Sequence, residues 1–89
     1  MSALHRLSGV ERSKAVGEAF GAAINSSPDG RARVSFRGPD GAPTTLTVFL
    51  VGVAWNPTHN GTQEALIVRP LDARYAINMI PFTRLISIS

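Results

Sequence analysis

The stretch TTLTVFLVGVAW, residues 44–55, decides the fold of this chain. Its side chains alternate along an extended backbone, and after Leu46 both resulting faces are apolar. A strand that runs from Thr44 to Trp55 is longer than the usual five or six residues, and a long strand with an interior glycine, here Gly52, commonly bends there. The stretch therefore predicts the bent second strand of a small barrel, covered on both faces by a helix or by another subunit.

Four further short strands are indicated around this stretch. Arg31–Arg37 alternates between basic and apolar residues, and the turn signal at Gly38–Gly41 predicts that it forms a hairpin with the strand that follows. Asn56–Thr62 is predicted as a polar loop with an Asn-Gly turn. The remaining strands are expected at Glu64–Arg69, at Tyr75–Ile80 before Pro81, and in the tail Arg84–Ile88.

One amphipathic helix precedes all the strands, from Ser8 to Asn25. Ser8 and Glu11 match the capping box, in which each side chain bonds the backbone amide of the other. An apolar stripe follows at spacings of three and four, through Val16, Phe20, Ala23 and Ile24. The predicted fold is therefore mainly β with one helix: an N-terminal α-helix followed by a five-stranded antiparallel, strongly bent barrel.

Length and composition limit the possibilities further. The 89 residues make one domain, with a flexible N-terminus at 1–7, the helix at 8–25 and the barrel at 31–89. Apolar residues make up 44% and charged residues only 17%, so we expect exposed apolar area and hence a partner or self-association. There is no cysteine, which excludes disulfides and thiolate metal sites.

The apolar segments are too short for membrane insertion. The longest, Val48–Trp55, falls far short of the roughly 20 residues that span a bilayer, and the N-terminus holds no apolar run typical of a signal peptide. We therefore expect a soluble, cytoplasmic protein without a membrane partner.

The closing segment carries a family resemblance. Residues 80–88, IPFTRLISI, resemble the end of Sm-like and SH3-like small barrels, where an apolar-Pro-apolar turn leads into the last strand. The segment is also similar to the C-terminal half of WYL domains, although Glu64-Ala65-Leu66-Ile67 stands where that family has its Trp-Tyr-Leu triplet. The glycine and aspartate motifs of Sm proteins are missing, so no family binding residue transfers. The resemblance implies a barrel whose edge strands pair between subunits into rings and which binds RNA or small ligands.

No catalytic, metal or cofactor motif is present. His5 lies near the N-terminus and His59 in a polar loop, neither with a second ligand at metal-binding spacing, so both are expected in solvent. Glu11 and Glu18 share a helix face, but Glu11 has a capping role. The chain lacks a nucleophile elbow and a phosphate loop, which points away from an enzyme.

The basic residues suggest a binding surface. The net charge is +3, and eight of the nine basic residues are arginines, which make forked hydrogen bonds to phosphate. Single-strand binding by barrels combines a cationic groove with stacking rings. The candidate nucleic-acid-binding residues are Arg31, Arg33, Arg37, Arg69, Arg74, Tyr75 and Arg84. In the alternative interpretation, these arginines only solvate the exterior and pair with Asp29, Asp40, Glu64 and Asp72.

Three function classes therefore stay open. The first is a non-enzymatic, oligomeric Sm-like module that binds RNA or single-stranded DNA. The second is a structural protein of phage or mobile-element type, whose edge strands pair into a homo-oligomer. The third is a WYL-like ligand-sensing domain. The candidate oligomer interface consists of Leu85, Ile86, Ile88 and Trp55.

Overall fold

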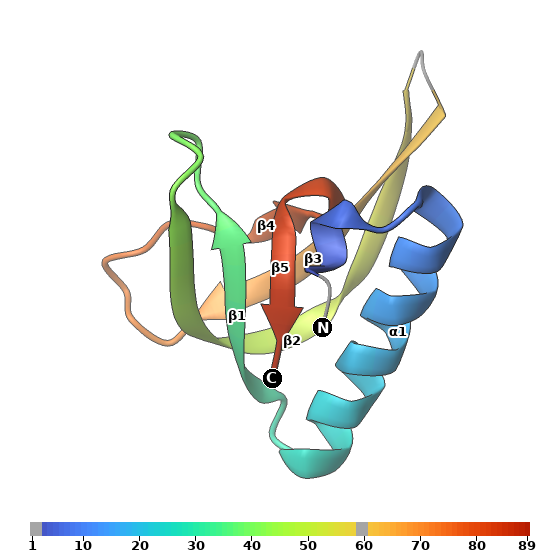
Figure 1. Ribbon diagram of the computed structural model, residues 1–89. Coiled ribbons are helices and arrows are strands. Elements are labelled where there is room, and N and C mark those ends of the chain that lie inside the picture. Colours follow the sequence, from blue (N-terminus) through green and yellow to red (C-terminus); the bar gives the residue numbers. More distant parts are fainter. Residues whose placement is uncertain (1–2, 59–60) are drawn as a thin grey trace.

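One antiparallel sheet of five strands, in the order β4-β3-β2-β1-β5, is flanked on one side by a helix (Figure 1). The computed structural model describes residues 3–58 and 61–89. The elements are η1 (Leu4–Arg6), α1 (Gly9–Ser26), β1 (Arg31–Arg37), β2 (Pro43–Thr58), β3 (Gly61–Pro70), β4 (Met79–Pro81), η2 (Phe82–Arg84) and β5 (Leu85–Ile88). The fold class predicted from the sequence, mainly β with one N-terminal helix, is confirmed.

Strand β2 bends where the sequence predicts it. Its pairing with β3 shifts register between Leu50 and Gly52, so Val51 is an extra residue without a cross-strand partner. Such a bulge bends the strand. Beyond it, Val53 and Trp55 are 47% and 62% exposed, so the prediction that both faces of this strand are covered is wrong for the single chain.

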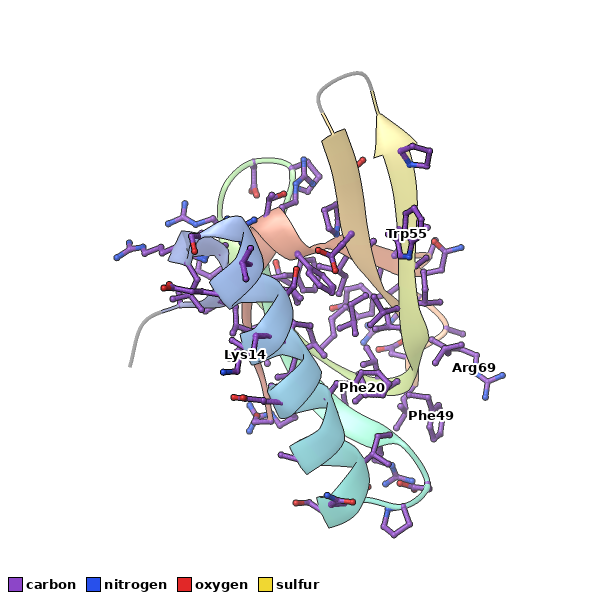
Figure 2. All side chains as sticks on the ribbon, turned by 90° about the vertical axis from the view of Figure 1, so that its right-hand side faces the viewer. Lys14, Phe20, Phe49, Trp55 and Arg69 are labelled. Atoms are coloured by element: carbon purple, nitrogen blue, oxygen red, sulfur yellow. The ribbon has the colours of Figure 1, made fainter. Side chains whose placement is uncertain are left out.

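The core lies between α1 and the inner face of the sheet. Val16 and Ala23 are buried, and Phe20 and Ile24 pack partly buried against the same cluster, which confirms the apolar stripe of the helix. Figure 2 shows Phe20 between α1 and β2. The largest fully buried side chains are Leu66, Ile80, Leu85, Val16, Val34 and Val48. The burial of each such side chain stabilises the fold by about 1.5–3 kcal/mol relative to its exposure.

The two ends of the sheet are not joined. Strand β5 pairs antiparallel with β1, and Ser89 and Arg33 exchange backbone hydrogen bonds of 2.9 and 2.8 Å. Strand β4 pairs only with β3. Within the described residues the sheet is therefore open, and the closed barrel expected from the sequence is not formed.

The fourth strand is shorter than predicted. Instead of Tyr75–Ile80 it covers only Met79–Pro81, because Asp72 organises the preceding residues into a turn. The carboxylate of Asp72 accepts a hydrogen bond from the Arg74 amide at 3.0 Å, and its carbonyl accepts one from the Tyr75 amide at 3.1 Å. Pro81 ends the strand at the sheet edge, where a missing amide proton is tolerated.

The predicted polar loop at Asn56–Thr62 is mostly strand. Strand β2 continues to Thr58 and β3 begins at Gly61, so the two form a long arm at the upper right of Figure 1. The predicted turn around Asn60 and the position of His59 lie outside the described residues. Alternation of apolar residues is absent from this arm, which is why the sequence pattern missed it.

The N-terminal contacts differ from those predicted. Ser8 is the N-cap of α1, but its side chain makes no capping hydrogen bond, so the predicted capping box is wrong. Arg12 instead donates from Nη2 to the carbonyl of Leu7 at 2.7 Å. The sequence predicted a flexible segment with a solvated His5, whereas His5 is half-buried in η1 and its Nδ1 donates to the Leu85 carbonyl at 3.2 Å.

Two glycine-to-alanine substitutions are expected to have opposite effects on stability. Gly30 has a φ of +83° and stands 3.4 Å, measured from a built Cβ, from the Leu50 carbonyl, so Gly30→Ala forces a left-handed conformation that costs about 1–2 kcal/mol. Gly17 in α1 has open space around it, and Gly17→Ala should stabilise the helix by up to about 1 kcal/mol. Urea unfolding of the two variants and the wild type measures both; a destabilised Gly17→Ala would contradict the helix packing described above.

Candidate nucleic-acid interface

The outer face of β1 carries a row of arginines. Ala32, Val34 and Phe36 are buried on the inner face, so Arg31, Arg33 and the other odd-numbered residues point outward. Arg31, Arg33 and Arg37 are exposed, which confirms the alternation predicted from the sequence. The Arg37 guanidinium donates to the Gly41 carbonyl at 3.2 Å, which holds it over the hairpin turn.

An aromatic ring lies between two of the arginines. Phe49 of β2 is directly opposite Arg31 of β1 and also directly opposite Arg69 of β3. The Arg69 guanidinium carbon lies 5.3 Å from the centroid of the Phe49 ring, which is a cation–π contact. Figure 2 shows Phe49 and Arg69 side by side, away from Lys14 on the helix. The three residues form one row across three strands.

Hydroxyl groups complete this surface. The side chains of Ser35 and Thr45 are hydrogen-bonded at 2.8 Å, and Thr47 is directly opposite Arg33. We name the arginine face for the outward residues Arg31, Arg33, Ser35, Arg37, Thr45, Thr47, Phe49 and Arg69. The six acidic residues of the chain lie on α1, in the turns around β1 and β4, or on the inner side of β3, so the strands contribute no carboxylate to the arginine face.

A carboxylate does border the arginine face at the start of β1. Asp29 lies 3.5 Å from the Arg31 guanidinium and accepts hydrogen bonds from the Ser27 hydroxyl at 2.6 Å and the Arg31 amide at 3.1 Å. The Ser27 bond, then the Arg31 amide, and then the Arg31 charge hold the pKa of Asp29 below its ordinary value. The guanidinium of Arg31 is thus fixed beside Phe49 rather than left free in solvent.

The other predicted binding residues are placed differently. Arg74 and Tyr75 lie in the 71–78 loop, whose first amide, that of Leu71, donates to the Thr47 carbonyl at 3.2 Å. The loop therefore begins beside the arginine face, but the Arg74 charge is held by Asp72 at 2.6 Å. The Arg74 side chain lowers the pKa of Asp72 and the pKa of Arg74 is raised in turn. Arg84 lies on η2, which packs against η1, and is not brought to the arginine face.

The predicted interface residues divide into two kinds. The side chains of Leu85 and Ile88 are buried in the core, whereas Ile86 is half-buried and Trp55 is exposed on the arm. Because Ser87 and Ser89 face β1, the backbone groups of Ile86 and Ile88 point to the open edge of β5. Contact of β5 with a second copy would therefore involve its backbone and Ile86.

Phe49 is the interface residue that the sequence reasoning missed. Its position within an apolar run marked it as a core residue, although the register opposite Arg31 follows from the hairpin turn at Gly38–Gly41. Within the described residues, no group of three metal-ligating side chains occurs, and no helix is long and apolar enough to cross a membrane.

Comparison with known proteins identifies no relative. No family model matches the chain, and no curated protein or solved structure matches it. The functional interpretation therefore depends on the geometry of the chain itself.

The titration of Asp29 is expected to report its contacts. Its carboxyl should titrate below the ordinary pKa of 3.8, and Ser27→Ala should raise that pKa toward 3.8 more than Arg31→Ala does. Because the pKa of Asp29 is lowered in the folded state, its contribution to stability is present above the unfolded pKa and is lost as the pH falls through the folded pKa. Carbon-detected NMR of the side-chain carboxyl measures the pKa; an unchanged value in Ser27→Ala would contradict this contact.

Proposed function

We propose that this chain is a non-enzymatic module that binds single-stranded RNA or DNA on the arginine face. The observation that carries the proposal is the row of Arg31, Phe49 and Arg69 in register across three strands. It combines cationic groups with a stacking ring on a surface to which the strands bring no carboxylate. That combination is typical of barrels and sheets that bind a single strand without reading its sequence.

The arginines provide the phosphate contacts. Arg33 lies in the middle of the face, one pleat along from Arg31, so their side chains are about 7 Å apart along the strand. A guanidinium stays charged at every physiological pH and can make two parallel hydrogen bonds to one phosphate group. Within the described residues, Arg33 and Arg69 form no ion pair, which leaves both available for an anion.

Phe49 supplies the stacking surface. Bases stack on aromatic rings with about 1–3 kcal/mol per base, irrespective of sequence. A base must be unpaired to reach a ring that lies flat on a sheet, so the geometry favours single strands over duplexes. Arg69 already lies over the ring and fixes its position, and it can contact the adjacent phosphate.

The fold that we propose for this module is an open form of the Sm-like small barrel. Three features support it: the N-terminal helix, the bent β2, and the single 3₁₀ turn η2 before the last strand. The pairing of β5 with β1 supports it as well, because it returns the last strand to the first. The kinship rests on this order of elements.

Charge reversal at one position tests the nucleic-acid proposal. Arg33→Glu should weaken the binding of a fluorescent oligo(U) or oligo(dT) by about tenfold or more and should reduce the slope of log K against log salt by about one. Lys14→Glu is the matched control, because it makes the same change in net charge on the exposed side of α1. Anisotropy titrations at several salt concentrations measure both. Equal weakening by the two variants, or no binding by the wild type at low salt, would overturn the proposal.

A homo-oligomer built through the edge strands is the second part of the proposal. Strands β4 and β5 are each paired on one side only, and both carry apolar residues that give little protection against edge pairing. A ring or similar assembly would bring several arginine faces together and increase their combined affinity. The structural role considered from the sequence, assembly without nucleic acid, requires the same contact.

A lysine on the edge of β5 should prevent this assembly. Ile86→Lys places a charge on a half-buried side chain of the edge strand, and edge charges oppose strand pairing. Asn25→Lys, at an exposed position of α1, adds the same charge elsewhere. Light scattering after size exclusion should give an oligomer for the wild type and Asn25→Lys and a monomer for Ile86→Lys. A monomeric wild type at micromolar concentration would exclude edge pairing.

A further inference from the structure

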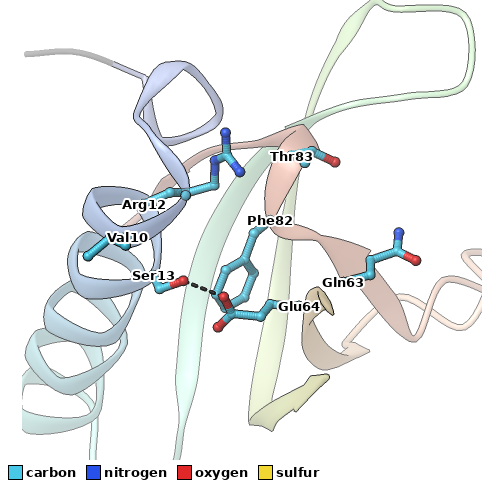
Figure 3. Close-up of a pocket in the computed structure, with 8 residues that line it drawn as sticks. Val10, Arg12, Ser13, Gln63, Glu64, Phe82 and Thr83 are labelled. Carbon is cyan, nitrogen blue, oxygen red and sulfur yellow. Dashed lines mark hydrogen bonds between the residues drawn. The ribbon is translucent and has the colours of Figure 1, made fainter. Parts of the chain in front are cut away.

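A groove opens on the helix side of the sheet, away from the arginine face. It lies between the first turns of α1 and the segment formed by β3 and η2, and it encloses about 580 Å³ (Figure 3). That volume lies within the range of about 300–1,000 Å³ found for small-molecule sites. Phe82 forms its apolar wall, and Thr83 lies at its rim. The interior of the sheet is filled by the core, so this surface groove is the place where a small ligand fits.

Two opposite charges line the groove without neutralising each other. Arg12 projects from α1 and Glu64 from β3, and Figure 3 shows the guanidinium above and the carboxylate below. The ion pairs of the described residues are Arg31–Asp29 and Arg74–Asp72, so Arg12 and Glu64 form none. A positive and a negative group that share one groove and stay apart leave room for a ligand between them.

Each of the two charges keeps unused hydrogen-bonding capacity. The Glu64 carboxylate accepts the Ser13 hydroxyl on Oε1, which orients it and leaves the other oxygen available. Arg12 donates from Nη2 to the carbonyls of Leu7 and His5, at 2.7 and 3.4 Å, while a guanidinium has five N–H donors in all. Both side chains are thus held in place by the protein before any ligand arrives.

We propose that this groove binds a small zwitterion of the α-amino acid class. Its ammonium group would pair with Glu64, its carboxylate with Arg12, and its side chain would lie on Phe82. A simple anion would be repelled by Glu64 and a simple cation by Arg12, whereas a ligand that carries both charges satisfies both. Val10, 84% exposed beside the groove, extends the apolar wall for the ligand side chain.

The groove and the arginine face are separate sites. Glu64 and Arg69 are five positions apart on β3, so their side chains leave opposite faces of the sheet. Loss of one site leaves the other intact, and the two proposals can fail independently.

Titration with truncated ligands tests the two-charge requirement. L-Leucine and L-phenylalanine, at millimolar concentration, should shift the backbone amide signals of Ser13, Glu64 and Thr83 in ¹⁵N–¹H NMR spectra. Leucinamide lacks the carboxylate and 4-methylpentanoate lacks the ammonium group, so each should bind at least about tenfold more weakly than leucine. Absence of shifts with both amino acids at 10 mM, taken as roughly the weakest useful affinity, would overturn the proposal. Equal binding of a truncated ligand would also overturn it.

One charge-removing variant tests the role of Glu64. In Glu64→Gln the side-chain carbonyl can still accept the Ser13 hydroxyl, so the contact between α1 and β3 is kept while the charge is removed. Its affinity for leucine should fall about tenfold. Glu18→Gln makes the same charge change at an exposed position of α1 outside the groove and should leave the affinity unchanged. Equal affinities of the two variants would contradict the assignment, and the truncated ligands decide the matter if Glu64→Gln fails to fold.

Discussion

Strand β2 is hydrogen-bonded along both of its edges, to β1 on one side and to β3 on the other, and the other elements take their positions from it. Its alternation fixes which side chains of all three strands point inward. A slip of one residue in its register with β1 would turn the arginines into the core and the apolar residues into water. The buried Val34 and Val48, at 0% exposure each, make such a slip prohibitively costly.

The same alternation separates two chemically different surfaces. The inner face of the sheet is covered by α1 and ends, at Glu64, in a groove with one charge of each sign. The outer face carries arginines, hydroxyl groups and the ring of Phe49. The bulge at Val51 is the point at which the two halves of β2 diverge, because the ladder loses its register there. One strand thus determines both the packing and the placement of each candidate site.

The sequence predicts the parts of this fold that depend on periodicity. The helical stripe through Val16 and the alternation of β1 are confirmed, because burial imposes periods of 3.6 and 2 on those segments. The predictions fail where hydrogen bonding decides. Asp72 organises a turn in place of the predicted strand, and Arg12 takes the place of the Ser8 cap. The role of Phe49 depends on register across three strands, which local pattern alone does not give.

The acidic residues decide between a surface that binds and one that only solvates the exterior. Four carboxylates were available to pair with the arginines, and two of them do so, Asp29 with Arg31 and Asp72 with Arg74. The carboxylate of Asp40 instead accepts the Ala42 amide. The fourth, Glu64, accepts a hydroxyl on the other side of the sheet.

The arginine face therefore has two arginines, Arg33 and Arg69, for which the described residues provide no counter-charge. Arg69 is additionally held in place by an aromatic ring. A guanidinium that serves only solubility gains nothing from being fixed, because ordering a long side chain costs up to about 2 kcal/mol of rotamer entropy. Fixed geometry favours recognition of an anion, since the ordering cost is then met in the folded protein before the partner binds.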